Sequence, residues 1–243
     1  MKVNARIIKY QKKINIMYMA QYIIGDIHDE IKKLDQNSID LIYTNPPFGT
    51  TQKKWDVPLR WEELFCEMDR VLKPNGVILL HCSVPFTYDL IRIRKPNYHH
   101  TWKKNNPTNF FQAKKQPLRC IEEILVYYKK KHTYNPQMIG DQIATNKRNN
   151  NYIGNQYYGD QKPNFSNHVG KYPTTFLGSF KRILQKTSPK SVPDEIMQEM
   201  IKTYSNENDL VLDMTCCDKG LGNITTNLKR KYIGIDISDE FLK

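Results

Sequence analysis

The chain has 243 residues and contains no long run of apolar residues. This absence excludes a transmembrane helix, which needs about 20 consecutive, mostly apolar residues. The N-terminal segment, Met1 to Gln21, is basic but lacks the uninterrupted apolar region and the small-residue cleavage site of a secretory signal. We therefore expect neither a membrane protein nor a secreted one, and we assign the chain to the cytoplasm or to whichever compartment holds its partner.

Cysteine is scarce, with five residues and no paired C-x-x-C spacing. The odd number argues against a disulfide framework, and the spacing argues against a structural zinc site. His99 and His100 would point to opposite faces of a strand, and no carboxylate cluster accompanies them, so we expect no metal centre. A reducing intracellular compartment is the simplest setting for such a chain.

Acidic residues are outnumbered: 25 Asp and Glu face 37 Lys and Arg, which gives a formal net charge of +12 and a pI of about 9.3. Such an excess indicates a polyanionic partner. The basic residues gather between Arg92 and Lys131, where aromatic residues are interleaved with them. A solvated, lysine-rich exterior is the alternative explanation. The residues that we expect to contact phosphates are Lys103, Lys104, Lys114, Lys115 and Arg119.

Apolar periodicity predicts alternating strands and helices in the first half of the chain. The predicted strands are Ile14–Ile24, Ser38–Thr44 and Val77–Leu80, and the predicted helices are Ile27–Leu34, Leu59–Leu72 and Ser83–Ile93. This alternation is typical of a parallel sheet covered by helices. Two further strand candidates, Tyr98–Lys103 and Ile121–Tyr128, could form an antiparallel pair at a sheet edge.

The pattern weakens from Lys131 to about Phe180, where Asn, Gln, Gly, Tyr and Lys dominate. It returns with a helix over Pro193–Tyr204, a strand over Leu210–Asp213, a helix from about Asn223 to Lys229 and a strand over Tyr232–Asp236. We therefore expect one α/β core formed by residues 1–130 and 181–243, with residues 131–180 as an insertion.

The tetrapeptide Asn45-Pro46-Pro47-Phe48 closes the predicted strand that ends at Thr44. Two prolines fix φ and lack N–H groups, so the carbonyls of Asn45 and Pro46 stay free to accept hydrogen bonds. Two acceptors beside an aromatic face suit a planar amine, such as that of a nucleobase. The alternative is an ordinary loop in which Phe48 anchors the core.

A second candidate site follows the strand that ends at Asp213. A turn containing Gly220 and Gly222, a helix, and another strand ending in Asp236 form a pattern typical of the nucleoside-binding half of a doubly wound sheet. The carboxylate of Asp236 is our candidate for accepting the two ribose hydroxyls. Alternatively, Asp213 and Asp236 only cap helices.

The tetrapeptide, with the strand before it and the segment through Asp56 after it, resembles the D-P-P-Y/F catalytic region of amino-group DNA methyltransferases. Similar segments recur along nearly the whole chain, at Val71–Val77, Trp102–Lys104, Glu123–Val126, Tyr134–Gln137 and Ser188–Lys190. The motif that resembles the catalytic turn comes first in the chain and the strand that resembles the cofactor-binding strand comes last. This order of motifs is similar to that of the circularly permuted beta group of these enzymes. The resemblance implies a doubly wound, mostly parallel, seven-stranded Rossmann-like sheet with an antiparallel edge strand, and 131–180 as the target recognition region.

By this resemblance the cofactor is S-adenosylmethionine and the partner is DNA, with a homodimer or a second subunit as further possible partners and restriction-modification as the setting. The base would be flipped out against Asn45, Pro46, Pro47 and Phe48 and methylated by direct in-line transfer. No cysteine follows a proline, which excludes the nucleophile that carbon-five cytosine methylation needs. The implied cofactor-binding residues are Asp26 near the adenine ring, Lys190 near the methionine end, Asp236 on the ribose, and Asp213, Thr215 and Gly220 in the turn.

Two departures from the family pattern affect the expected activity. Asn45 stands where most relatives with this motif order carry Asp, and it favours adenine N6 over cytosine N4, for which Ser is typical. Cys217 and Lys219 stand where close approach of the backbone to the cofactor normally calls for glycine. The alternatives are thus a cytosine-N4 methyltransferase and a degenerate family member that binds DNA or completes a complex.

Overall fold

The computed structural model describes residues 20–144, 168–180, 192–240 and 242. The chain divides into two compact units, one formed by residues 1–135 and 175–243 and the other by residues 136–174. Residues 14–19 of the first predicted strand lie outside the described residues, as does Lys190.

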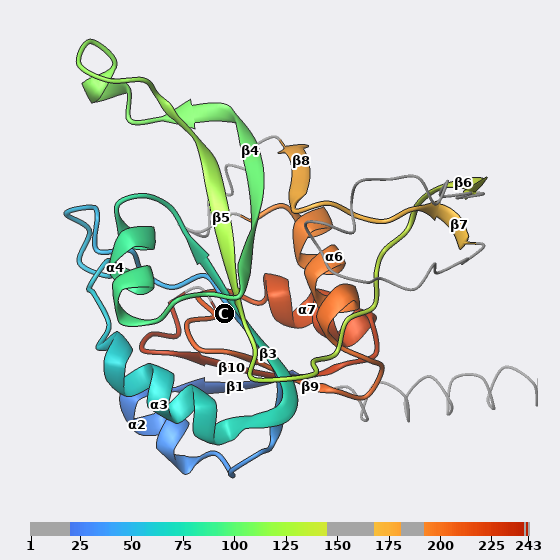
Figure 1. Ribbon diagram of the computed structural model, residues 1–243. Helices are drawn as coiled ribbons and strands as arrows, with labels where there is room; N and C mark the ends of the chain where they lie inside the picture. The colour runs from blue at the N-terminus through green and yellow to red at the C-terminus, as the bar shows by residue number, and fades with distance from the viewer. Residues whose placement is uncertain (1–19, 145–167, 181–191, 241, 243) are drawn as a thin grey trace, which may run out of the picture. The chain divides into compact units, whose positions relative to one another are not determined.

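The first unit is built on one sheet, in which the described residues form eight strands in the order β1-β10-β9-β2-β3-β5-β4-β8 (Figure 1). Neighbouring strands are parallel except where β5 pairs antiparallel with β3 and β4. The strands are β1 (Ala20–Ile24), β2 (Ile39–Thr44), β3 (Leu72–Cys82), β4 (Tyr98–Thr108), β5 (Arg119–Tyr127), β8 (Phe176–Phe180), β9 (Leu210–Asp213) and β10 (Lys231–Asp236).

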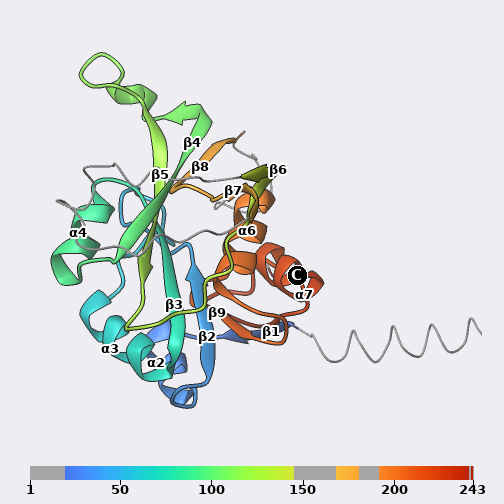
Figure 2. The same cartoon turned by 45° about the vertical axis from the view of Figure 1, so that its right-hand side comes forward.

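Helices cover both faces of this sheet. In Figure 2, α2, α3 and α4 lie on one side and α6 and α7 on the other. Their bounds are α2 (Ile27–Glu30), continued by the 3-10 turn η1 (Ile31–Lys33), α3 (Trp61–Val71), α4 (Phe86–Ile93), α6 (Asp194–Tyr204) and α7 (Gly220–Asn227). The longest described helices have 11 residues, and none of the described helices combines the length and apolar character that a bilayer crossing requires.

Two hydrophobic cores, one on each face, follow from the alternation of side chains along the strands. In β5, Leu125 and Tyr127 pack with α3 and α4, whereas Ile124 and Val126 pack with α6. The same alternation places Leu212 of β9 in the first core and its neighbour in the second. Burial of both sheet faces explains why the central strands read as continuous apolar runs.

The expected fold class is confirmed: the sheet is mostly parallel and doubly wound, and β9 and β10 follow the Asn45–Phe48 turn in sequence. Two details differ from the expectation. The antiparallel strand β5 lies inside the sheet, because β4 pairs with its outer side. The eighth strand, β8, then pairs parallel with β4 and forms that edge.

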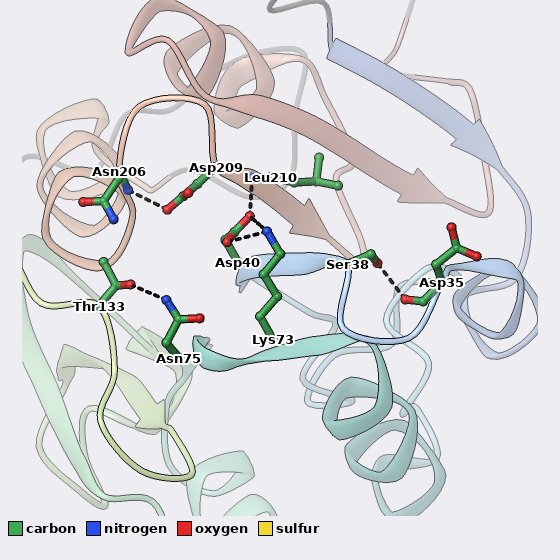
Figure 3. Close-up of polar contacts among 9 residues, drawn as sticks. All are labelled: Asp35, Ser38, Asp40, Lys73, Asn75, Thr133, Asn206, Asp209 and Leu210. Atoms are coloured by element: carbon green, nitrogen blue, oxygen red, sulfur yellow. Dashed lines mark hydrogen bonds and ion pairs between the residues drawn. The ribbon is translucent and has the colours of Figure 1, made fainter.

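A carboxylate joins three strands at the amino edge of the sheet (Figure 3). Both side-chain oxygens of Asp40 in β2 lie 2.8 Å from Nζ of Lys73 in β3, and the backbone amide of Leu210 in β9 donates to Asp40 Oδ2 at 2.9 Å. The pairing register between β2 and β3 shifts at this place, between Ile39 and Leu41. Asp40 thus holds the irregular start of β3 against the two central strands.

The second unit contains a two-stranded antiparallel sheet, β6 (Ile139–Ala144) with β7 (His168–Lys171). The chain leaves the first unit at Asn135, whose backbone amide donates to the Thr203 carbonyl at 2.7 Å and whose side-chain amide donates to the Ser205 carbonyl at 3.1 Å. It returns at Thr175, whose carbonyl accepts from the amide of Thr101 at 2.8 Å. The second unit, residues 136–174, lies within the predicted insertion 131–180, and residues 176–180 of that range form β8 of the main sheet.

Candidate active site

The carboxyl ends of the parallel strands meet at one edge of the sheet, and the chain changes winding direction between β2 and β9. From β2 the sheet continues to β3 on one side, and from β9 it continues to β10 on the other. In open α/β sheets, ligands bind outside the strand ends at such a switch point. Asn45 follows β2 directly, and Asp213 ends β9, so both candidate motifs flank this point.

A cavity at the switch point is lined by both motifs. Asn45 contributes from residues 45–48 after β2, which we call the catalytic turn after its predicted role. Asp213, Thr215 and Gly220 contribute from residues 213–220 between the end of β9 and the start of α7, which we call the cofactor turn after its predicted role. The other lining residues are Tyr43, Thr44, His81, Val192, Asp194, Met197, Cys216, Cys217, Asp218 and Leu221. The structure therefore brings together four of the predicted site residues, whereas Asp26, Pro46, Pro47, Phe48 and Asp236 are not among the lining residues.

Hydrogen bonds connect the two turns directly. The Thr44 hydroxyl donates to Asp213 Oδ1 at 2.8 Å and lies 3.0 Å from the Thr215 hydroxyl. The Thr215 hydroxyl also donates to the backbone carbonyl of Asn45 at 3.4 Å. The buried carboxylate of Asp213 thus fixes both the end of the catalytic strand and the start of the cofactor turn.

The catalytic turn differs from the expectation at one acceptor, because the backbone carbonyl of Asn45 accepts from the Thr215 hydroxyl. Pro46 and Pro47 are buried, and Asn45 is half-buried. Among the described residues, none donates a hydrogen bond to the Asn45 side chain or to the Pro46 carbonyl. Both acceptors are therefore available to a planar amine.

Phe48 packs on an aromatic neighbour. Its ring is half-buried and stacks on Phe86 of α4, with centroids 5.1 Å apart and planes at 20°. Trp61 in turn lies against Phe86, with centroids 5.6 Å apart. One face of Phe48 is thus braced by the core, as expected both for a core anchor and for a ring that offers its other face to a base.

The segment after Phe48 is organised by Asp56, a role that the sequence reasoning missed. The carboxylate accepts from the amides of Gly49 at 2.8 Å, Thr50 at 3.0 Å and Thr51 at 2.7 Å. Burial alone would raise the pKa of Asp56, but the Thr51 hydroxyl and these amides outweigh burial and lower it. Gly49 has φ +65°, and an added Cβ would meet Pro58 Cγ at 2.6 Å, so only glycine fits here.

The cofactor turn is held by Asp236. Its Oδ2 accepts from the amide of Cys217 at 2.8 Å and its Oδ1 from the amide of Ser238 at 3.1 Å. Cys217 has φ +54°, a left-handed conformation that favours glycine. Gly222, in contrast, lies in α7 against Tyr232 of β10, where an added Cβ would meet the ring at 2.9 Å. Gly222 therefore serves close packing of helix on sheet.

Asp26 caps the helix α2. Its Oδ1 accepts from the amide of His28 at 2.9 Å and contacts Nδ1 of the same residue at 2.8 Å. The backbone bond from His28, and then the side-chain bond, lower the pKa of Asp26. Its side chain is 50% exposed and contributes no lining atom to the cavity, so the observed role of Asp26 is capping.

The predicted DNA-binding residues divide into two groups on the β4–β5 hairpin. Lys103, Lys114, Lys115 and Arg119 are exposed. Lys104, which alternates to the other face of β4, is buried and donates to Glu122 Oε1 at 2.8 Å. Its ammonium group is therefore used within the protein.

Sequence reasoning also missed two walls of the cavity. Asp194 and Met197 come from α6, which packs against the second core.

His81 of β3 stacks on Tyr43, with ring centroids 5.4 Å apart, and its Nε2 lies 3.0 Å from the Tyr43 hydroxyl. Burial, and then the charge of Asp213, raise the pKa of Tyr43 well above its usual value. The sequence does contain a signal for this wall of the cavity: Tyr43 and His81 are polar side chains in two adjacent apolar strands.

The sheet order and the paired turns define a doubly wound fold of the methyltransferase type. Residues 39–243 match the family described as "DNA methylase", whose members act on amino groups at N6 or N4, and the chain belongs to this family.

Individual relatives are more distant. The chain is 28% identical over 235 residues to the "Type II methyltransferase M.HpaI" of Haemophilus parainfluenzae, covering 88% of this chain and 68% of the relative. It is 27% identical over 241 residues to the "DNA adenine methyltransferase YhdJ" of Escherichia coli K12, covering 91% and 79%.

Two solved structures share the fold. A complex of M1.HpyAVI with SAM aligns with a TM-score of 0.58 and 21% identity, covering 92% of this chain and 95% of that one. The cytosine-N4-specific PvuII DNA methyltransferase aligns with a TM-score of 0.61 and 15% identity, covering 93% and 85%.

Proposed function

We propose that this chain transfers a methyl group from S-adenosylmethionine to the N6 amine of adenine in DNA. The observation that carries the proposal is the single cavity that joins Asn45 to the turn after Asp213. An acceptor for an amine and a nucleoside-binding turn are thereby within one site, as direct transfer between two bound substrates requires. Membership of the DNA methylase family supports the same reaction class.

The residues of the cavity fit this cofactor. Asp194, Asp213 and Asp218 make one part acidic, and Met197 and Leu221 make another part apolar. Carboxylates favour an ammonium group and a sulfonium centre, while apolar side chains suit the thioether chain and the adenine ring. When bound, S-adenosylmethionine supplies an electrophilic methyl group. Asp236, beside the turn through its bond from Cys217, is our candidate for the ribose hydroxyls.

The chain's own residues would position the amine. The side-chain oxygen of Asn45 and the carbonyl of Pro46 accept its two hydrogens, which aims the nitrogen lone pair out of the base plane. Phe48, braced from behind by Phe86, offers its free face to the flipped base. Because the acceptors are fixed by the two prolines, little reorganisation is needed when the base arrives.

Adenine is favoured over cytosine by Asn45, and a relative named as a DNA adenine methyltransferase agrees with it. Cytosine N4 remains a second candidate, because the cytosine-N4-specific PvuII enzyme shares the fold. The residues 136–174 supply our proposed target recognition region. Dimer formation and a second subunit stay predictions.

The test is methyl transfer from labelled S-adenosylmethionine to duplex DNA, followed by separation of the nucleosides. We expect label in N6-methyladenine, and loss of at least about 100-fold in rate for Asn45→Ala, because the amine loses its fixed acceptor. Asn75→Ala is the matched control, since Asn75 is an exposed asparagine at the opposite edge (Figure 3).

Three results would contradict the proposal. Label only in N4-methylcytosine would show that the target base is cytosine and not adenine. An active Asn45→Ala variant would remove the catalytic turn from the mechanism. Absence of transfer and of S-adenosylmethionine binding, with DNA binding intact, would identify a degenerate family member.

A further inference from the structure

Two consecutive phenylalanines lie exposed at the tip of the β4–β5 hairpin. Phe110 is 64% exposed and Phe111 is 103% exposed. Both belong to the 3-10 turn η2 (Phe110–Gln112) that follows β4. A fully exposed aromatic ring forgoes about 2 kcal/mol of burial, and adjacent exposed rings usually mark a surface that another molecule covers.

The tip is an ordered structure. Asn109 adopts a left-handed conformation with φ +72° and reverses the chain. Backbone amides then close the turn: Gln112 donates to the Asn109 carbonyl and Ala113 to the Phe110 carbonyl, each at 3.0 Å, and Gln116 donates to the Gln112 carbonyl at 2.9 Å. The two rings are thus carried on a hydrogen-bonded frame.

The strand register places this tip beyond the edge that carries the cavity. Cys82, at the carboxyl end of β3, pairs with Glu123 of β5, whereas β5 begins beyond that point, at Arg119, which pairs with Thr108. At about 3.3 Å per residue, the hairpin reaches on the order of 13 Å further before its turn begins. Figure 1 shows this hairpin extending past the neighbouring strands.

The charges around the tip specify the chemistry of the covering molecule. Lys114 and Lys115 follow the two rings, Arg119 begins β5, and all three are exposed. The buried Lys104 pairs with Glu122, whereas Lys103, Lys114, Lys115 and Arg119 are exposed on the surface of the hairpin. Aromatic rings beside exposed cations match a nucleic acid, which offers phosphates beside stacked bases.

We propose that Phe110 and Phe111 insert into the DNA stack beside the target base and hold open the space from which that base is extruded. This inference rests on the proposed DNA methyltransferase function. Lys114, Lys115 and Arg119 contact the flanking phosphates and set the depth of insertion. Stacking of the rings on the exposed neighbouring bases offsets the unstacking that base extrusion costs.

The test uses the full chain and a duplex carrying the sequence that the wild type methylates, found by sequencing DNA from cells that express it. The target base is replaced by 2-aminopurine, whose fluorescence rises when it leaves the stack. We expect Phe111→Ala to lower the rise at least about five-fold and Phe110→Ala to lower it as well, because stacking on a base is lost. Phe111→Trp should retain it.

The matched control is Tyr134→Ala. Tyr134 is a 43% exposed aromatic residue that follows β5 at the opposite, amino edge of the sheet, and its removal should leave the fluorescence unchanged. Equal melting temperatures of variants and wild type exclude misfolding as the cause of any loss. Failure of the wild type to bind or methylate DNA would refute the proposed function, which separates that failure from the failure of this inference.

With an active wild type, an unchanged fluorescence rise in a Phe110→Ala, Phe111→Ala double variant would overturn the inference. So would dissociation of a wild-type dimer by the double variant in light scattering, with base extrusion intact. That second result would assign the two rings to a contact between protein chains.

Discussion

Replacing Cys217 by glycine tests whether the turn after β9 favours glycine at this position. Its φ of +54° lies in the left-handed region, which costs a residue with a Cβ about 1–2 kcal/mol. Glycine removes that cost but adds about 0.5–1 kcal/mol of backbone entropy to the unfolded chain. Cys217→Gly should therefore stabilise the protein by about 0.5–1 kcal/mol, or raise Tm by on the order of 1–4 °C.

The same substitution should also strengthen cofactor binding. Cys217 lines the cavity, and its amide is fixed on Asp236, so removal of the Cβ allows the cofactor to approach the backbone more closely. We expect Kd for S-adenosylmethionine, measured by calorimetry, to fall several-fold. Cys217→Ser keeps the Cβ and should show neither gain.

Lys229→Gly is the matched backbone control. Lys229 has φ +63° and lies in the loop before β10, where its exposed side chain pairs with Glu207 at 3.3 Å. It should gain stability like Cys217→Gly, yet leave cofactor affinity unchanged. A Cys217→Gly variant that is less stable than wild type and binds the cofactor no better would refute the reasoning.

Two further predictions concern carboxylates that hold the frame of the site. Asp40→Ala should lower the free energy of unfolding by about 1–3 kcal/mol, because the Leu210 amide loses its acceptor. The control is Asp35→Ala at an exposed position, which should change the free energy of unfolding by less than about 0.5 kcal/mol. Equal denaturation midpoints for the two variants would contradict the role of Asp40. The folded pKa of Asp56 is lowered, so its contribution to stability is present above the unfolded pKa of about 4 and disappears as pH falls through the folded value. Asp56→Asn should remove that part of the acid dependence, and urea titrations from pH 2 to 6 that give parallel curves for both proteins would count against it.

The sequence predicts most of the first unit because its strands are buried on both faces. Ser38–Thr44 reads as an apolar run and contains β2, and the turn after it lies at the same edge as Asp213 because parallel strands end together. β8 was not predicted, since Phe176–Phe180 is a short edge strand whose pairing partner, β4, lies far away in sequence.

The site is less predictable where it depends on packing between distant elements. Asp194 and Met197 reach the cavity only because α6 packs across the sheet, and no local pattern indicates that contact. Lys103 and Lys104 are adjacent in the sequence, yet the pleat of β4 exposes one and buries the other. The pairing register of β4 with its neighbouring strands must be known before one can predict which of the two lysines is exposed.

The two anchor points of the second unit bear on how such chains diversify. Asn135 is tied to the carbonyls of Thr203 and Ser205, and Thr175 is tied to Thr101, so both ends are fixed on the first unit by contacts that do not involve the intervening residues. A segment of different length or composition between Asn135 and Thr175 would leave these anchoring bonds in place. The segment that we propose for target recognition could thus be exchanged between such chains while the main sheet and its turns are kept.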